Sequence, residues 1–136
     1  MVQQFEIRLS EFKRGFHLIT HLVMNVIDKF PAFGIMHVHI KHTSAALTLN
    51  ENADPSVRTD FEHYFDKLVP ENATFFTHTD EGLDDMPAHI KASLLGNSVT
   101  IPISNYKPNL GTWQGIYLCE FRNHGGRRNL IVTILS

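Results

Sequence analysis

The chain of 136 residues has a length typical of one domain and can bury a substantial core without disulfide or metal staples. Hydrophobic residues make up 43% and charged residues 19%, which excludes an intrinsically disordered chain. The formal net charge is −2 and no basic run or acidic tail occurs, so we expect no nucleic-acid partner. We therefore predict a single domain over residues 1–136.

Two features concern the cellular compartment. The single cysteine, Cys119, cannot form an internal disulfide, which is typical of a protein in a reducing compartment. The N-terminal residues MVQQFEIRLS lack the apolar segment of a signal peptide, and no window reaches the roughly 18 apolar residues of a membrane helix. We expect a cytoplasmic protein with no membrane partner.

The first third of the chain predicts strands around one helix. Residues 4–9 alternate between polar and apolar side chains, as strands do. From Thr20, apolar residues recur at helical spacing until Pro31, which predicts a helix between them. Residues 34–50 are rich in β-branched and apolar side chains and predict one long strand or two short ones.

The next predicted helix has clear boundaries. Asp54 is a good N-cap, Pro55 suits the first helical position, and Pro70 ends the helix. We expect its apolar residues at helical spacing to form the buried stripe: Val57, Phe61, Tyr64, Phe65 and Leu68. After a polar loop, a short helix begins near Pro87 and ends at Gly96.

The last third is β-rich and determines the predicted fold class. Strand-like segments occur at residues 99–103, 112–121 and 130–135. Tight turns between consecutive strands favour antiparallel pairing. We therefore predict an α+β protein: an antiparallel β-sandwich with two to three helices packed on it.

The stretch HTDEGLDDMPAH, residues 78–89, places four carboxylates and two imidazoles within twelve residues. It can be a solvated loop in which one aspartate caps the following helix. That explanation does not account for Asp84 and Asp85 together with His78 and His89. A divalent cation such as zinc or magnesium binds carboxylate oxygen, and zinc binds neutral imidazole as well. We predict these four residues as metal ligands.

His42 stands beside three small residues, Ser44, Ala45 and Ala46, which leave its ring accessible. An accessible histidine can act as a ligand or as a general base. The polar residues that follow, up to Asp54, are also explained by turn formation and helix capping.

Two residues of the segment GTWQGIYLCEF are further candidates. Trp113 can offer a flat stacking face to a ligand, or it can belong to the core or a subunit interface. Glu120 alternates onto one face of the strand with Ile116 and Leu118. A carboxylate among apolar neighbours needs an arginine or a metal as its partner.

The segment HGGRR, residues 124–128, can form a backbone nest whose N–H groups, with Arg127 or Arg128, hold a phosphate. It can equally be a plain hairpin turn with exposed arginines. The pattern alone does not separate the two.

Four motifs in this order resemble the YjbQ-like family, also called secondary thiamine-phosphate synthases: HTSAALTLNEN, DDMPAHIKASLLG, LGTWQGI and the GGRR segment before the last strand. The resemblance covers essentially the whole chain. It implies an antiparallel β-sandwich with helices, assembled as a homotrimer. It also implies a polar cavity with a bound metal, and a weak activity that joins a pyrimidine methyl diphosphate to a thiazole phosphate.

The resemblance assigns roles to motif residues of this chain. The implied catalytic residues are His42, Glu120 and Arg127, with His42 moving protons. The implied substrate-binding residues are Asn50 and Trp113. The hypothesis of a metal-assisted transferase adds Lys91, which would assist Arg127 at the phosphate.

Three functions are compatible with these residues. The first is a metal-assisted transferase for a small phosphorylated metabolite, in which a cation neutralises the diphosphate leaving group. The second is a metal-dependent hydrolase of phosphate esters, in which the metal activates a water molecule. The third is a non-enzymatic, metabolite-binding trimer.

Overall fold

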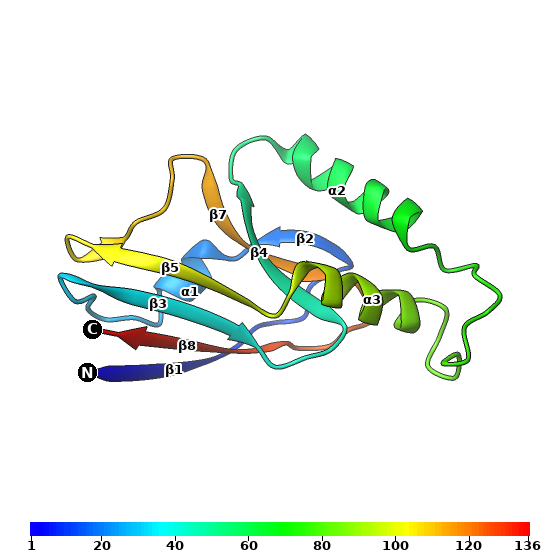
Figure 1. Ribbon diagram of the computed structural model, residues 1–136, viewed down its shortest axis with the longest axis horizontal. Coiled ribbons are helices and arrows are strands. Elements are labelled where there is room, and N and C mark those ends of the chain that lie inside the picture. The colour runs from blue at the N-terminus through cyan, green and yellow to red at the C-terminus, as the bar shows by residue number, and fades with distance from the viewer.

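The computed structural model describes residues 1–136 and contains two antiparallel sheets and three helices (Figure 1). The larger sheet has the strand order β1 (Val2–Arg8), β8 (Asn129–Leu135), β3 (Phe33–Ile40), β5 (Ser98–Ser104), β6 (Lys107–Pro108). The smaller sheet has the order β2 (Gly15–Leu18), β7 (Gln114–Glu120), β4 (Ala45–Glu51). The helices are α1 (Thr20–Met24), α2 (Pro55–Leu68) and α3 (Asp85–Leu95). The predicted α+β class and antiparallel sheets are confirmed.

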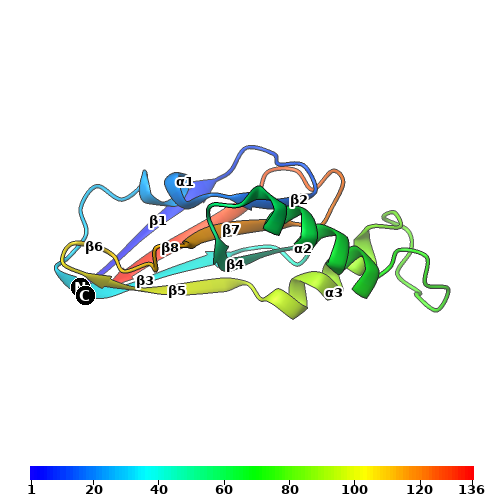
Figure 2. The same cartoon turned by 90° about the horizontal axis from the view of Figure 1, so that it is seen from above.

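The molecule is layered, and strand alternation determines which residues fill each layer. The larger core lies between the sheets and includes Val38 of β3, Val132 of β8 and Leu118 of β7. A second core lies on the other face of the smaller sheet, where Tyr117 and Cys119 of β7 pack with residues of α3. Figure 2 shows α2 and α3 on the side of the smaller sheet. None of the three helices is both long and apolar enough to cross a membrane.

Local sequence signals fix the ends of α2 and α3. The carboxylate of Asp54 accepts a hydrogen bond from the backbone N–H of Ser56 at 2.9 Å, and Pro55 begins α2, as predicted. Gly96 ends α3 with a φ of 99°, a conformation that favours glycine.

The predicted buried stripe of α2 is only partly correct. Phe61 and Phe65 pack against the second core, whereas Tyr64 is 64% exposed and Leu68 is 52% exposed. The physical reason is geometric. α2 packs mainly against β2, so only the side of the helix that carries Phe61 and Phe65 is covered.

The predicted helix from Thr20 to Pro31 is too long, because α1 ends at Met24. Thr20 does not cap it: its hydroxyl accepts a hydrogen bond from the backbone N–H of Ile116 at 2.9 Å. Ile27 remains buried in the larger core without helical backbone. The helical spacing of these apolar residues therefore indicates that they are buried, but it does not indicate a continuous helix.

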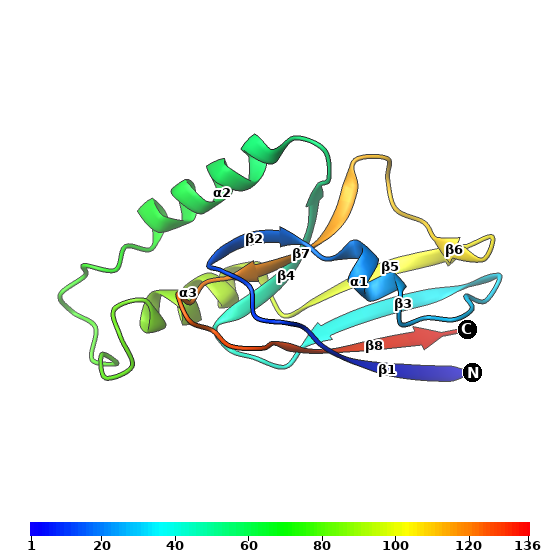
Figure 3. The same cartoon turned by 180° about the vertical axis from the view of Figure 1, so that it is seen from behind.

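Residues 34–50 form two strands in different sheets, β3 and β4, so the second of the two predicted possibilities is correct. β4 pairs with β7 so that Ala45 lies opposite Glu120. This register brings the loop before β4 next to the loop after β7, at the end of the molecule where α3 begins. Figure 3 shows the opposite end, where the two termini lie side by side.

Candidate functional site

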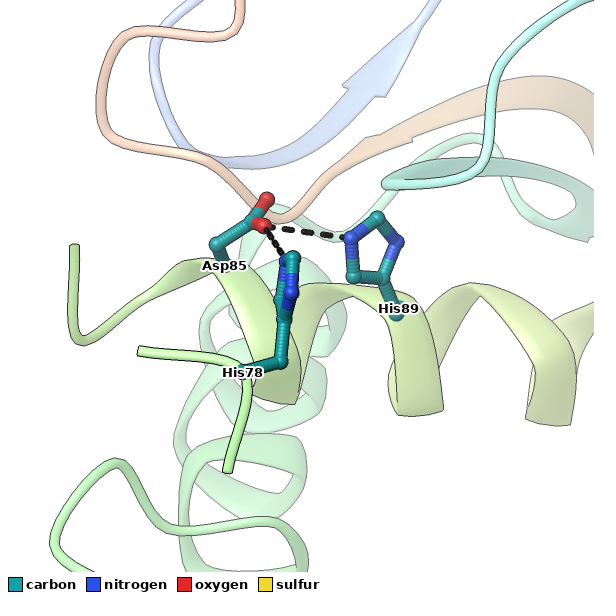
Figure 4. Close-up of side chains that lie close together, drawn as sticks. All are labelled: His78, Asp85 and His89. Atoms are coloured by element: carbon teal, nitrogen blue, oxygen red, sulfur yellow. Dashed lines mark hydrogen bonds and ion pairs between the residues drawn. The ribbon is translucent and has the colours of Figure 1, made fainter. Parts of the chain in front are cut away.

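His78, Asp85 and His89 form one cluster at the start of α3 (Figure 4). Each residue offers one atom that could bind a metal, and these three atoms all lie within 4.8 Å of one another. One carboxylate oxygen of Asp85, Oδ2, lies 2.6 Å from Nε2 of His78 and 3.2 Å from Nε2 of His89. Two imidazoles and one carboxylate therefore converge on a single point.

The helix and the loop before it bring these residues together. Asp85 and His89 are four residues apart in α3, so their side chains share one face of the helix. His78 comes from the loop between α2 and α3 and folds back onto Asp85. The local helical spacing thus supplies two donors, and the loop supplies the third.

Arg122, which follows β7, holds the start of α3 in place. Its guanidinium donates to Oδ2 of Asp84 at 2.9 Å, to Oδ1 of Asp85 at 2.6 Å and to the backbone carbonyl of Glu81 at 2.9 Å. These contacts use all three nitrogens of the guanidinium. The geometry fixes the Asp85 carboxylate so that Oδ2 faces the two imidazoles.

Hydrogen bonds and nearby positive charges keep the buried Asp85 ionised. The residue is only 1% exposed. Burial by itself would raise the pKa of Asp85, but the hydrogen bond from His78 and the positive charges of His89 and Arg122 lower this pKa below its ordinary value. The side chains of His78 and His89 are 46% and 29% exposed, so the cluster opens to solvent on the imidazole side.

The tautomer of His89 follows from its other contact. Nδ1 lies 2.9 Å from the backbone carbonyl of Thr43, and a carbonyl can only accept, so Nδ1 carries a proton. In a neutral ring, Nε2 then presents a lone pair to the Asp85 carboxylate. Two acceptors face each other at 3.2 Å, an arrangement that requires a second ring proton or a cation between them.

Asp84, the fourth predicted metal ligand, is directed elsewhere. Its carboxylate accepts hydrogen bonds from Arg122 and from the backbone N–H of Asn123, both at 2.9 Å. It makes no side-chain capping bond to α3, so the capping explanation does not hold for Asp84 either. Asp84 anchors the loop after β7 and lies outside the three-residue cluster.

Glu120 and Arg128 form a buried ion pair. Nε of Arg128 donates to one carboxylate oxygen of Glu120 at 2.8 Å and Nη2 donates to the other at 2.5 Å. Nη2 also donates to the hydroxyl of Ser44 at 3.0 Å. The prediction that Glu120 needs an arginine or a metal is confirmed, with an arginine as the partner.

Arg127, the arginine with an implied catalytic role, points away from this pair. It donates to the backbone carbonyls of Leu9 at 2.9 Å and Arg8 at 3.1 Å, which ties the last strand to the end of β1. Gly125 packs directly on Glu120, where a Cβ atom would clash with the carboxylate. The glycine at position 125 thus allows the turn to pack closely on Glu120.

His42 lies near the cluster but outside it. Its Nε2 accepts a hydrogen bond from the backbone N–H of Asn129 at 2.8 Å. Burial, followed by the charge of Arg128, lowers the pKa of His42 below its ordinary value. His42 is therefore a neutral imidazole with its proton on Nδ1.

The three residues with expected substrate contacts are dispersed. Asn50 lies at the far end of β4, where it pairs with Gly115, and Trp113 is 63% exposed just before β7. Asn50 lies five positions along the strand from Ala45, which corresponds to about 17 Å. Lys91 is 1% exposed and donates to Asp66 of α2 at 2.7 Å. Within one chain these three residues do not line the three-residue cluster.

Cys119 is fully buried in the second core. Burial strongly raises the pKa of its thiol, so the reactive thiolate is not formed near neutral pH. Cys119 therefore packs as a small buried hydrophobic residue.

Sequence reasoning gave no role to three residues around the cluster. Arg122 holds Asp85, the Thr43 carbonyl orients His89, and Glu81 lies with one carboxylate oxygen 3.9 Å from Nε2 of His78. Arg128, which was considered only as a phosphate ligand, holds Glu120. Buried carboxylates at Asp85 and Glu120 signal that two arginines are required, and Arg122 and Arg128 flank the turn after β7. The backbone contact of Thr43 has no signal in the sequence.

The family model described as UPF0047 protein YjbQ-like matches residues 4–136 of the chain. The UPF0047 protein YjbQ of Salmonella typhimurium is 51% identical over 136 residues, which cover 98% of each chain. The protein of the same name from Escherichia coli O157:H7 is 47% identical over the same shares. The crystal structure of an uncharacterized conserved protein of the YjbQ/UPF0047 family from Clostridium acetobutylicum has a TM-score of 0.84 and 38% identity. The match covers 96% of this chain and 99% of the Clostridium acetobutylicum chain.

Proposed function

The chain belongs to the YjbQ-like family, UPF0047, and from this premise we propose that it is a divalent-metal-dependent enzyme acting on a small phosphorylated metabolite. The residues that would hold the metal are His78, Asp85 and His89. The observation that carries the proposal is the convergence of two ring nitrogens on one oxygen of a buried carboxylate.

The donor set fits a cation in three respects. Two imidazoles and a carboxylate are the protein ligands of many catalytic zinc sites, in which a further position stays open for water or substrate. The hydrogen bond from His89 to the Thr43 carbonyl is the outer contact that orients metal-binding histidines. Arg122 fixes the carboxylate in the same way. Because magnesium prefers oxygen ligands, this set favours zinc over magnesium.

We favour hydrolysis of a phosphate monoester over transfer with a diphosphate leaving group. A bound divalent cation supplies charge neutralisation at phosphate oxygens and makes water more acidic. Water attacks phosphorus, the ester P–O bond breaks, and the products are an alcohol and inorganic phosphate. The exposed carboxylate of Glu81, near His78, is the group placed to accept the proton. Diphosphate would need further cationic donors, but Arg122 and Arg128 are both held by carboxylates.

Transfer of the thiamine-phosphate synthase type is the second candidate, because the family resemblance implies it. Incubation with a pyrimidine methyl diphosphate and a thiazole phosphate separates the two reactions. A coupled two-ring product supports transfer, whereas release of phosphate without coupling supports hydrolysis.

Metal removal is the experiment that tests the proposed function. We expect dialysis against a chelator to abolish phosphate release from a panel of phosphate monoesters, and added zinc to restore it. The measurement is colorimetric phosphate release at neutral pH, compared with untreated protein. Undiminished turnover by protein that elemental analysis shows to be metal-free would reject the proposal.

We expect replacement of Arg122 by methionine to weaken zinc binding by about 10- to 100-fold, because outer contacts of metal ligands contribute to affinity on this scale. Arg122→Lys restores only part of the loss, since an ammonium cannot contact Asp84, Asp85 and the Glu81 carbonyl together. Competition with a chromophoric zinc chelator measures both affinities. Arg8 is exposed, so Arg8→Met is the matched control. We expect this variant to bind zinc as tightly as the unmodified protein. An unchanged affinity in Arg122→Met would contradict the role of Arg122.

We also propose the homotrimer that the family resemblance implies. The uncovered apolar side chains of α2, Tyr64 and Leu68, supply surface that a neighbouring subunit can cover. Light scattering during gel filtration tests it: we expect three times the chain mass of 15.5 kDa, and a monomer mass would contradict it.

A further inference from the structure

A polar hollow of about 340 Å³ lies between α3 and the start of β4. We call it the His42 pocket, and it is lined by His42, Thr43, Ala45, Ala92, Ser93, Gly96 and Asn97. The two alanines give it an apolar floor, and the other side chains offer hydroxyl, amide and imidazole groups. A volume of this size suits a small organic group.

The His42 pocket lies beside the proposed metal site. Thr43 lines the pocket, and its carbonyl accepts the hydrogen bond from His89. Ser93 follows His89 by four residues in α3, so the two lie on the same helix face. One helical turn, about 5.4 Å, therefore separates the metal ligand from the pocket wall.

The lining of the pocket contains no charged side chain. His42 is kept neutral, because its Nε2 accepts from the Asn129 N–H and it lies near Arg128. Its Nδ1–H has no acceptor within the chain and remains free to donate. Ser93 and Asn97 add groups that both donate and accept. The pocket thus selects a polar, uncharged group that offers at least one acceptor.

We propose that the His42 pocket binds the uncharged, hydroxyl- or carbonyl-bearing organic group of a phosphate monoester whose phosphate lies at His78, Asp85 and His89. This assignment rests on the proposed function and specifies its substrate class. A charged organic group, such as a second phosphate or an ammonium, finds no partner in the pocket and is disfavoured.

Calorimetric titration of zinc-loaded protein tests the assignment with two probes, inorganic phosphate and glycerol phosphate. Both probes present phosphate to the metal, but only glycerol phosphate carries an uncharged polar group. We expect glycerol phosphate to bind about tenfold more tightly, because one or two added hydrogen bonds contribute on this scale.

Two variants locate this advantage in the pocket. Ser93→Phe fills the pocket from an exposed helix position, and we expect it to abolish the preference for glycerol phosphate while the affinities for zinc and inorganic phosphate stay unchanged. Leu94→Phe adds the same ring at the next position, which is 58% exposed and outside the pocket, and should retain the preference. His42→Gln keeps an acceptor for the Asn129 N–H but removes the ring donor, and we expect a partial loss.

The outcomes separate this assignment from the proposed function. Equal affinities for the two probes in the unmodified protein, or a preference that survives Ser93→Phe, would overturn the pocket assignment and leave the metal site standing. Failure of the unmodified protein to bind zinc would reject the proposed function, and the pocket assignment would be rejected with it.

Discussion

Replacement of His89 by alanine is expected to lower zinc affinity by at least about 100-fold and to abolish turnover. Loss of an outer contact to a metal ligand already costs about 10- to 100-fold, and His89 is itself one of only three donors. The variant should fold normally, because His89 is a partly exposed side chain whose only hydrogen-bond partners are Thr43 and Asp85. Zinc affinity by chelator competition and phosphate release are the two measurements.

The matched control is His63→Ala, because His63 is an exposed histidine on α2. It tests whether loss of any surface imidazole changes zinc binding. We expect this control variant to have the same zinc affinity and the same turnover as the unmodified protein. Equal zinc binding by His89→Ala and His63→Ala would mean that the metal lies elsewhere.

Replacement of Arg128 by methionine should have the largest effect on stability, a loss of about 3–5 kcal/mol in the free energy of unfolding. The variant leaves the fully buried Glu120 carboxylate without its partner. It also removes the donor to the Ser44 hydroxyl. Urea denaturation followed by circular dichroism, at one fixed protein concentration, measures the change.

Two comparison variants identify the source of this loss. The neighbouring Arg127 is exposed and donates only to backbone carbonyls, so Arg127→Met should cost about 1 kcal/mol. A double variant, Arg128→Met with Glu120→Leu, removes both charges and should recover most of the stability. A loss below about 1 kcal/mol in Arg128→Met alone would show that Glu120 finds other compensation.

Helix boundaries were predictable where single residues determine them. Asp54 and Pro55 start α2, and Gly96 ends α3, because capping and backbone conformation are local properties. The spacing after Thr20 predicted a longer helix than α1. Apolar residues such as Ile27 are buried there by tertiary packing, which helical periodicity does not distinguish from helix formation.

The three residues of the candidate metal site were predictable from the sequence, but the residues that hold them in place were not. The helical spacing of Asp85 and His89 places both on one face, and His78 joins them as predicted. Asp84 precedes Asp85 by one residue, so its side chain leaves the backbone in a different direction. Its carboxylate contacts Arg122 and Asn123. The spacing of two adjacent aspartates could not tell which of them faces the imidazoles.

The arginines show a similar limit. Arg127 and Arg128 are neighbours in an irregular segment before β8, where no alternation indicates which side chain points inward. The buried position of Glu120 predicted that an arginine or a metal was needed, but the identity of that arginine depends on the tertiary path of the loop. The same holds for Arg122, which reaches Asp85 across 37 residues of sequence.

Anomalous X-ray scattering at the zinc absorption edge, from crystals of the unmodified protein grown with zinc, tests the central claim most directly. We predict one strong peak at about 2.0–2.2 Å from Nε2 of His78, Nε2 of His89 and a carboxylate oxygen of Asp85. A map with no peak at these three residues, or with zinc bound only at other histidines, would contradict the account.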